Sequence, residues 1–371
     1  MNDFLKNLFN FNKTDTNVIG VDIGSSSIKI VQLAKSKGKA ILKTYGSLAI
    51  GPYAGVTIGQ SAVLPGEKIS EILIDLMKEA NVTTTNAGVA IPLRSSLVSL
   101  IEMPNLSQSE LQKMVPLEAR KYIPVPITEV TMDWWVIPKD ETRTFSSPQS
   151  APSLKADKAE VLVVSIHNEV LSNYTSIIKN AGLSTSFFEI EMFAAVRSLI
   201  EHELSPIMVF DMGASATKLY LVERGVVKQS HIINKGSQDI TISLSQGLQV
   251  TMEKAEKIKR SIGTLSPEEG KNIYDIAELT LDYIFSEAGS VLLSFEKKNH
   301  KSISRVYLTG GGVLMKGFLD IAKSKFQTDV VIGDPFTKIE VPAFLSGILK
   351  ESGLDFAVAT GLALRKLQEF L

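Results

Sequence analysis

The sequence contains no cysteine among its 371 residues. This absence excludes disulfides, thiolate nucleophiles and zinc sites built on cysteine, and it fits a reducing compartment. The four histidines, His167, His202, His231 and His300, are scattered along the chain, and no two of them have the spacing of a metal-binding motif. We therefore expect no metal site built on histidine.

An excess of either charge is also lacking, because 39 basic side chains are matched by 40 acidic ones. A net charge of −1 gives no general attraction to nucleic acid or to anionic lipid, so neither is expected as a partner. No run approaches the roughly 18 consecutive apolar residues that a membrane-spanning helix needs. We expect no integral membrane segment, and two or three domains at about 150 residues each.

Two segments share one pattern, in which a buried strand, a turn of small residues and a returning strand form a hairpin. They cover residues 18–33 and 207–222, and both contain Asp-x-Gly-x-Ser-x-x-Lys, at residues 22–29 and 211–218. The second copy begins about half a chain length after the first. This recurrence predicts an internal duplication with two related lobes.

The turn of each hairpin is suited to phosphate. Glycine allows a close approach, while consecutive backbone N–H groups and serine hydroxyls donate hydrogen bonds. Lys29 lies on the returning strand, where its ammonium can reach the same phosphate. A single copy is also consistent with an ordinary Gly/Ser turn. Two copies facing across a cleft would hold a polyphosphate from both sides, and Asp22 and Asp211 would bring two carboxylates to one Mg²⁺.

Residues 305–314 form a third candidate element, a strand that runs into Gly310, Gly311 and Gly312 before a helix. Three consecutive glycines let a flat ring or a ribose lie against the backbone. The element is not a G-x-G-x-x-G fingerprint, and the sequence contains no G-x-x-x-x-G-K-[ST] phosphate loop. Neither of those nucleotide-binding classes is therefore indicated.

Between the hairpins, residues 93–189 predict a module with the element order β-α-β-β-α-β. Its centre contains a Ser/Pro-rich stretch at 138–152, which is typical of an extended loop. The expected strands cover residues 97–101, 130–137, 160–167 and 185–188, and the expected helices cover 107–121 and 169–181. Further helices are predicted at 191–202, 238–246, 251–262 and 267–299.

This order of motifs resembles the actin, Hsp70 and sugar-kinase superfamily of ATP-binding folds. Within it the sequence is similar, over nearly its whole length, to the FtsA-like PilM family of type IV pilus assembly proteins. The marks of that family are the position of the inserted module, the stretch at 118–126 and Asp133-Trp134-Trp135. Residues 191–196 and 356–363 look like the two connecting helices of the superfamily.

The resemblance implies an α/β fold, a two-lobed actin/Hsp70-like ATPase with an FtsA-type inserted β-α-β-β-α-β subdomain. The implied domains are an N-terminal tail at 1–16, a first lobe at 17–92 with 190–205 and 354–371, the inserted subdomain at 93–189, and a second lobe at 206–353. FtsA continues into a membrane helix that this sequence lacks, so membrane contact is expected through a partner or the N-terminal tail.

The resemblance also implies roles for individual residues toward ATP and Mg²⁺. Asp22 and Asp211 would position the metal, and Glu191 matches the acid that orients the attacking water in bacterial actin relatives. Glu189 lies two residues away, and a glutamate at this position also suits a helix N-terminus. The residues implied to bind the nucleotide are Asp22, Gly24, Ser25, Ser26, Lys29, Asp211, Gly213, Ala214, Ser215, Lys218, Glu256, Lys259, Gly310, Gly311 and Gly312.

The function implied is a cytoplasmic ATP-binding scaffold, peripheral at the inner membrane. It would dock the PilN-like cytoplasmic tail of a bitopic pilus protein on its inserted module and the neighbouring surface of the first lobe. Contacts with other pilus assembly proteins and self-association are left open. Hydrolysis is expected to be slow, because no arginine lies near the phosphate motifs to stabilise transferring charge. Two alternatives remain: a small-molecule kinase of the sugar or acetate type on the same fold, and an adaptor that binds no nucleotide.

Overall fold

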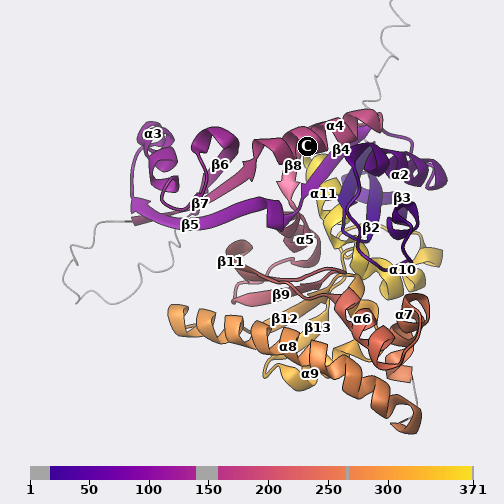
Figure 1. Ribbon diagram of the computed structural model, residues 1–371. Coiled ribbons are helices and arrows are strands. Elements are labelled where there is room, and N and C mark those ends of the chain that lie inside the picture. Colours follow the sequence, from indigo (N-terminus) through magenta and orange to yellow (C-terminus); the bar gives the residue numbers. More distant parts are fainter. Residues whose placement is uncertain (1–16, 139–157, 265–266, 370–371) are drawn as a thin grey trace, which may run out of the picture.

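The structure, a computed structural model, describes residues 17–138, 158–264 and 267–369. Two lobes lie one above the other in Figure 1, and each is built on a five-stranded sheet. The predicted tail at 1–16 and most of the Ser/Pro-rich loop lie outside the described residues. Among the described helices, none combines the length and the apolar character of a membrane span.

The sheet of the first lobe has the strand order β3-β2-β1-β4-β8. The first three strands are antiparallel, while β4 and β8 run parallel to β1. Helices α2 and α4 pack on the outer face. The bounds are β1 (Asn17–Ile23), β2 (Ser27–Ser36), β3 (Lys39–Ala49), α2 (Gly66–Glu79), β4 (Asn86–Ile91), α4 (Asn168–Asn180) and β8 (Ser184–Ile190).

The sheet of the second lobe has the order β11-β10-β9-β12-β13, which repeats the plan of the first. Strands β11, β10 and β9 are again antiparallel neighbours, while β12 runs parallel to β9 and β13 runs parallel to β12. This shared order agrees with the predicted duplication. The bounds are β9 (Ile207–Met212), β10 (Thr217–Glu223), β11 (Val226–Ile233), α6 (Ser237–Gly247), α7 (Met252–Ser261), α8 (Pro267–Asn299), β12 (Arg305–Thr309), α9 (Phe318–Lys325) and β13 (Asp329–Ile332).

The central strands are buried on both faces, which explains their continuous apolar sequences. In β9, Met208 and Phe210 face the cluster under α8, whereas Ile207 and Val209 face α5. Alternate residues of β1 divide in the same way between the two faces of the first sheet. Each lobe is therefore a sheet between two layers of helix.

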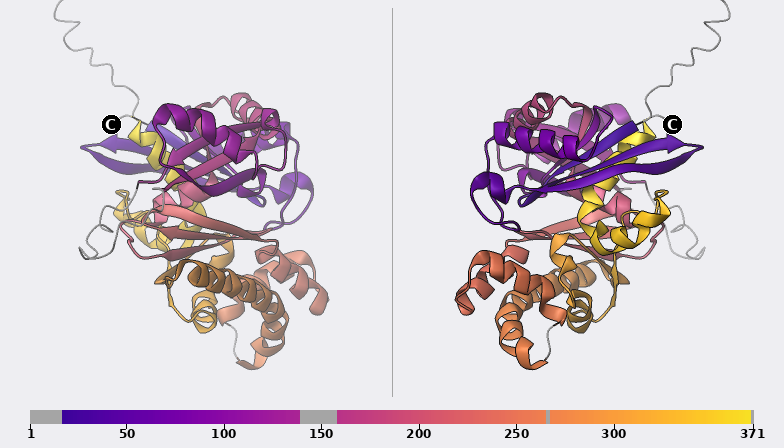
Figure 2. Two further views of the ribbon diagram at one scale, coloured as in Figure 1. Left: turned by 90° about the vertical axis from the view of Figure 1, so that its left-hand side faces the viewer. Right: turned by 90° about the vertical axis from the view of Figure 1, so that its right-hand side faces the viewer.

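Two connecting helices pack at the junction of the two lobes. Helix α5 (Glu191–Leu199) follows β8 of the first sheet but shares an apolar cluster with the second, and α11 (Ala357–Gln368) packs on the first. In Figures 1 and 2 the yellow α11 accordingly lies in the upper lobe beside the indigo strands. Helix α5 lies in a cluster with strands of both sheets, and the assignment of residues 190–205 to the first lobe stays a prediction.

The inserted module is smaller than predicted. Its sheet has the order β5-β7-β6, and α3 packs on one face. The predicted order of elements is correct, but α4 and β8 belong to the first lobe, because β8 pairs with β4. A local pattern does not specify which sheet a strand joins. The bounds are β5 (Ser96–Pro104), α3 (Gln108–Ala119), β6 (Val130–Val136) and β7 (Lys158–His167).

Candidate functional site in the cleft between the lobes

The turns of the two predicted hairpins meet in a cleft between the lobes. The Ser215 hydroxyl donates to the Ser25 hydroxyl across it at 3.1 Å. The cavity has a volume of about 550 Å³, within the range of small-molecule sites. Every residue predicted to contact nucleotide or metal lines this cavity, Glu191 included. The structure thus brings together residues from all three sequence motifs and from α7.

The two hairpin turns have the same geometry. The Gly24 N–H donates to the Ser27 carbonyl at 3.1 Å, and the Gly213 N–H donates to the Ala216 carbonyl at 3.0 Å. The strand register repeats as well, because Asp22 pairs with Lys29 and Asp211 pairs with Lys218. The shared sequence pattern therefore specifies a shared three-dimensional unit.

Acidic and basic side chains at the base of the cleft are not balanced in number. Lys29 forms an ion pair with Asp355 at 3.0 Å, and Lys218 lies 2.6 Å from Glu191 and 3.8 Å from Asp211. Two ammonium groups thus face four carboxylates that interact electrostatically, with Asp22 as the fourth. The cluster carries an excess of negative charge when all four are ionised.

Burial raises the pKa of Asp22 to about 6, although Lys29 opposes the shift. Burial also raises the pKa of Asp211, against the effect of Lys218, and the Tyr220 hydroxyl donates to this carboxylate at 3.2 Å. In both cases the nearby lysines do not offset the cost of burying the ionised form. A bound cation would reduce this cost.

The donor set fits Mg²⁺ that arrives with a polyphosphate. Within the described parts of the chain, no group of three or more His, Cys, Asp or Glu side chains is arranged to hold a metal. Mg²⁺ commonly uses one or two carboxylates together with phosphate oxygens and water. Asp22 and Asp211 supply that number of carboxylates beside the two turns.

Asp355 was not predicted as a site residue. It lies just before α11, in a short 3₁₀ turn at Gly353–Phe356, and holds the lysine that we expected to pair with phosphate. A Cβ added to Gly311 would lie 2.9 Å from its Oδ1 atom. The sequence signal was limited to its position beside the second connecting helix.

Glu191 is the first residue of α5 and is buried. Its Oε1 atom accepts a hydrogen bond from the Leu93 N–H at 2.7 Å, and its Oε2 atom pairs with Lys218. Both carboxylate oxygens therefore have protein partners. The expected role in orienting water stays a prediction.

The base of α7 forms a second polar cluster. Glu256 pairs with Lys259 at 2.7 Å and with Arg260 at 2.9 Å, and accepts from the Thr241 hydroxyl at 2.8 Å. Burial raises the pKa of Glu256, but these partners outweigh it and the net shift is downward. The same helix also carries the exposed Glu253–Lys257 pair at 2.7 Å. Arg260 is an arginine of the cleft lining that sequence reasoning missed.

Gly310 has a left-handed backbone, with φ of 90°. An added Cβ there would lie 2.5 Å from Oδ1 of Asp211 and 2.6 Å from the Met212 carbonyl oxygen. The glycine therefore allows the end of β12 to lie directly against the acidic end of β9. Close packing is one reason for this glycine, in addition to the predicted contact with a nucleoside.

The loop between β3 and α2, residues 50–65, joins both sides of the cleft. Ile50 and Ala62 donate backbone hydrogen bonds to the carbonyl groups of the first hairpin turn, at 2.9 and 3.0 Å. The Ser61 N–H donates to Oε1 of Gln238, on α6 of the second lobe, at 2.5 Å. Gly59 lies so close to Glu256 that an added Cβ would be 2.9 Å from its carboxyl carbon. Sequence reasoning identified neither this loop nor β3.

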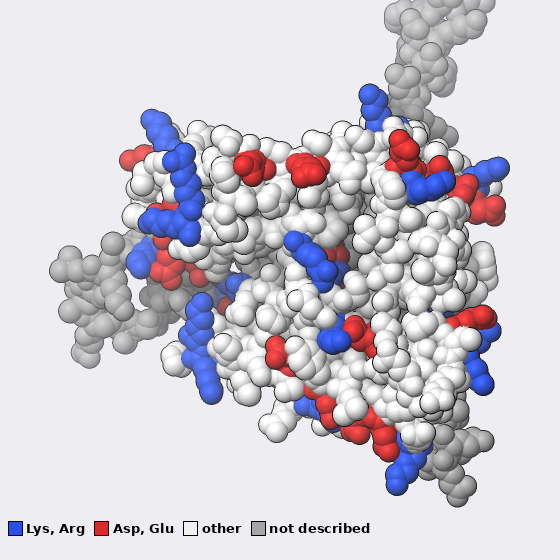
Figure 3. Space-filling model, in the orientation of Figure 1, with Lys and Arg blue, Asp and Glu red and all other residues white. Residues whose placement is uncertain are grey.

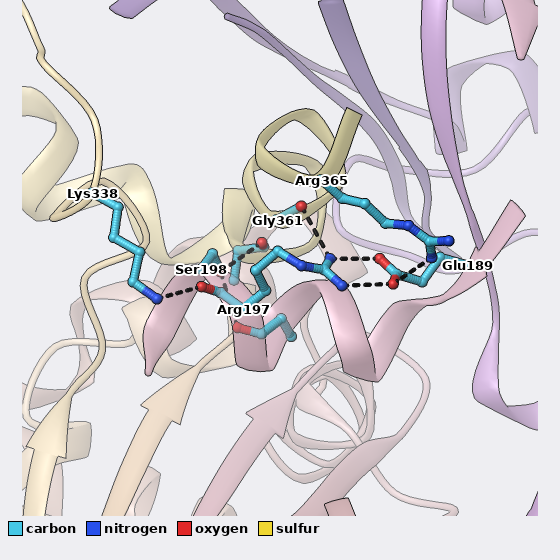
Figure 4. A network of polar contacts seen from close by, with 8 residues as sticks. Glu189, Arg197, Ser198, Lys338, Gly361 and Arg365 are labelled. Atoms are coloured by element: carbon cyan, nitrogen blue, oxygen red, sulfur yellow. Dashed lines mark hydrogen bonds and ion pairs between the residues drawn. The ribbon is translucent and has the colours of Figure 1, made fainter. Parts of the chain in front are cut away.

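Behind the cleft, α5 and α11 meet in the network shown in Figure 4. Buried Glu189 accepts two hydrogen bonds from Arg197, at 2.6 and 2.7 Å, and one from Arg365 at 2.7 Å. Arg197 also donates to the Gly361 carbonyl at 3.2 Å. Lys338 donates to the carbonyls at the end of α5. This carboxylate is fully paired with cations.

Basic and acidic side chains are interspersed on the face of the molecule shown in Figure 3, and neither sign forms a large patch there. Uncompensated charge is instead found inside the cleft.

A family profile described as "Type IV pilus assembly protein PilM" matches residues 20–367. Among curated proteins, the cell division protein FtsA of Staphylococcus epidermidis is 22% identical, over 89% of this chain and 77% of that protein. FtsA of Bacillus subtilis is 19% identical over 72% of this chain. The match spans 64% of the Bacillus protein, which is less than two thirds of its length.

Solved structures show the same fold. The structure titled "PilM-PilN type IV pilus biogenesis complex" matches with a TM-score of 0.78 and 24% identity, over 94% of this chain and 98% of the other. MreB5 of Spiroplasma citri bound to AMPPNP matches with a TM-score of 0.50 and 12% identity, over 97% and 100% of the two chains. These likenesses establish the two-lobed actin-like fold predicted from the sequence.

Proposed function

The chain belongs to the PilM family of type IV pilus assembly proteins, and from this premise we propose that it is an ATP-binding scaffold of the inner-membrane assembly platform. One observation carries the nucleotide part of the proposal. Two hairpin turns that share the pattern Asp-x-Gly-x-Ser-x-x-Lys face each other, with 3.1 Å between the Ser25 and Ser215 hydroxyls, above a cluster in which four carboxylates face two ammonium groups. Duplicated phosphate-binding turns with a charge deficit favour a polyphosphate with a divalent cation.

In this proposal the turns donate backbone hydrogen bonds to the phosphates, and Asp22 and Asp211 hold Mg²⁺. Glu256 and Lys259 contact the ribose, and the glycines at 310–312 lie beside the adenosine. Mg²⁺ would neutralise phosphate charge and orient the chain of phosphates. MreB5 of Spiroplasma citri, which shares the fold, was crystallised with AMPPNP, and this supports the proposal.

Slow hydrolysis is part of the same proposal. Both oxygens of Glu191 already have protein partners, so fewer of its lone pairs are available to an attacking water than on a free carboxylate. Arg260 lines the cleft, but its guanidinium pairs with Glu256, so it is already engaged and is not a free cation for the transferring phosphate. We expect turnover below about 1 per second, the low end of typical enzymes. The alternative of a small-molecule kinase gains no support from the FtsA, PilM and MreB relatives.

We further propose that the inserted module docks an extended peptide from the cytoplasmic tail of a PilN-like bitopic protein. The module's sheet presents β6 as an edge strand, which suits the addition of an extended segment. Its apolar side chains that are about half exposed are Met114, Leu117, Tyr122 and Trp135. The protein would then be cytoplasmic and peripheral at the membrane through this partner. Other assembly proteins and a second copy are further candidates for this surface.

Nucleotide binding is tested by mass spectrometry of the protein purified without added nucleotide, and by thermal unfolding with and without Mg-ATP. Asp22→Ala and Asp211→Ala are expected to remove most of the stabilisation, which is about 3 kcal/mol at a hundredfold excess over Kd. Asp320→Ala, on the exposed surface of α9, is the matched control and should respond like the wild type. Unchanged responses in both site variants would contradict the proposal.

Docking is tested by binding of a synthetic PilN tail to the full-length protein. The structure shows that a deletion of 93–189 would remove a strand of the first sheet, so residues 96–167 are the segment to replace with a short linker. Trp135→Ala should weaken capture, whereas Leu279→Ala on exposed α8 should not. Equal capture by the full-length and the shortened protein would place the docking site elsewhere.

A further inference from the structure

We propose that Glu191 transmits the occupancy of the cleft to the inserted module, through Lys218 on one side and the backbone of Leu93 on the other. The inference rests on the proposed binding of Mg-ATP and goes beyond it. In this proposal Glu191 is a positioning residue whose ion pair with Lys218 depends on whether the metal is bound. This role replaces the predicted role of orienting the attacking water.

The contacts form a continuous path from the cleft to the module. Asp211 lies 3.8 Å from the Lys218 ammonium, which lies 2.6 Å from Oε2 of Glu191. Oε1 of Glu191 accepts from the Leu93 N–H at 2.7 Å, a contact between residues 98 positions apart. Asp211, Lys218 and Glu191 line the cavity, whereas Leu93 is buried beyond it.

Leu93 lies where the chain leaves the first sheet for the inserted module. Strand β4 ends at Ile91, and β5 of the module begins at Ser96. Two contacts nearer the surface also hold the module against the second lobe, Lys228 with Glu160 at 2.5 Å and Arg94 with Asn234 at 2.9 Å. Such partly exposed contacts contribute little. The Glu191 carboxylate is the buried polar contact at this entry, beside the apolar cluster in which the Leu93 side chain packs.

The charge at the base of the cleft gives the path two states. Lys218 is shared between Glu191 and Asp211 while no divalent cation is present. A Mg²⁺ ion at Asp22 and Asp211 would supply the missing positive charge, and Lys218 would then be committed to Glu191. A stronger ion pair fixes the carboxylate that accepts from Leu93, so occupancy is coupled to the order of the module's first strand.

The test is hydrogen–deuterium exchange of the full-length protein, read on peptides that cover residues 90–101. Thermal unfolding first establishes that Mg-AMPPNP binds. Exchange is then compared without ligand, with Mg-AMPPNP, and with AMPPNP in EDTA. We expect Mg-AMPPNP to slow exchange of the Leu93 amide about tenfold, a typical size for coupling between sites. AMPPNP in EDTA should give little of this effect.

Two variants separate the steps. Glu191→Gln retains an oxygen that accepts from Leu93 but loses the charge that pairs with Lys218. We expect it to bind Mg-AMPPNP and to protect Leu93 equally with and without ligand. Lys218→Met, once thermal unfolding shows that it still binds Mg-AMPPNP, should also lose the response. Lys228→Met, a control that breaks the pair with Glu160, should retain it.

The outcomes are distinguishable. If Mg-AMPPNP does not raise the unfolding temperature, nucleotide binding itself fails. If it binds and Leu93 exchange is unchanged in the wild type, the coupling is overturned, whether or not the variants fold. A Glu191→Gln variant that keeps the tenfold response and loses only turnover would restore the water-orienting role.

Discussion

Glu189 and Glu191 are two residues apart and both are buried, yet they belong to opposite kinds of charge network. At the back of the molecule, Glu189 is enclosed by two arginines and every oxygen is hydrogen bonded (Figure 4). At the front, Glu191 shares Lys218 with Asp211, in a cluster where acids outnumber bases. The carboxylate of the back network is fully paired, whereas the front cluster has more carboxylates than ammonium groups.

This difference separates a structural network from a site. A buried carboxylate with full partners is consistent with holding two helices together, and removing a partner is costly. Buried carboxylates with raised pKa values in a cavity indicate a place for a ligand. Four predictions break or sharpen the contrast, beginning with the largest effect.

The largest loss of stability is expected from a methyl group placed between α5 and α11, behind the cleft. A Cβ at Gly361 would lie 1.8 Å from the Ala194 carbonyl oxygen of α5. Gly361→Ala should therefore destabilise the protein by about 4 kcal/mol or more, measured by denaturant unfolding. Gly289→Ala, in α8 with open space around it, is the matched control. It should be neutral or stabilising by up to about 1 kcal/mol. Similar stability of the two variants would contradict close helix packing.

Removing the carboxylate of Glu189 should have the next largest effect on stability. Glu189→Ala leaves Arg197 and Arg365 without their shared carboxylate, and we expect a loss of about 3 kcal/mol. The solvent-exposed pair of Lys257 and Glu253 provides the control, since Glu253→Ala should change stability by less than about 0.5 kcal/mol. A small effect at Glu189 would show that the back network is dispensable.

Replacing an acid of the front cluster should stabilise the protein, in contrast to replacing Glu189. Without Mg-nucleotide at pH 7.5, Asp22→Asn should raise stability by about 2 kcal/mol, because burial disfavours the ionised form.

The gain should disappear as the pH falls. The pKa of Asp22 is raised from 3.8 to about 6 in the folded state. Between these values folding takes up a proton, so the wild type gains stability as pH falls through 6 and has the full contribution below 3.8. Unfolding of both proteins from pH 7.5 to 4 measures the difference. A difference that does not depend on pH would contradict the raised pKa.

The smallest effect concerns the loop at the mouth of the cleft. Gln238→Ala removes the acceptor of the Ser61 N–H and should cost about 1 kcal/mol, with faster release of a fluorescent ATP analogue. Gln246→Ala, exposed on the same helix, is the control and should change neither stability nor release. Unaltered release in both variants would mean that the loop does not retain the nucleotide.

Local patterns predicted the parts of the site that are themselves local. Asp-x-Gly-x-Ser-x-x-Lys specifies a turn and its flanking groups together, so both hairpins formed where expected. The sequence could not separate the roles of Glu189 and Glu191, which lie at the junction of β8 and α5, because partners such as Arg365 and Leu93 are far away in the chain. The same holds for Asp355 beside Lys29, for Ser61 beside Gln238, and for the sheet that β8 joins.

The packing of the connecting helices has a consequence for the order in which the chain can fold during synthesis. The second sheet is covered by α5, which precedes it, and by α8, which lies between its strands. The first sheet waits for α11, which follows every described strand of both sheets in the chain. We therefore expect the later lobe to mature first. Until α11 is made, the face formed by Val18, Val31 and Leu33 needs a chaperone or the neighbouring lobe to protect it from aggregation.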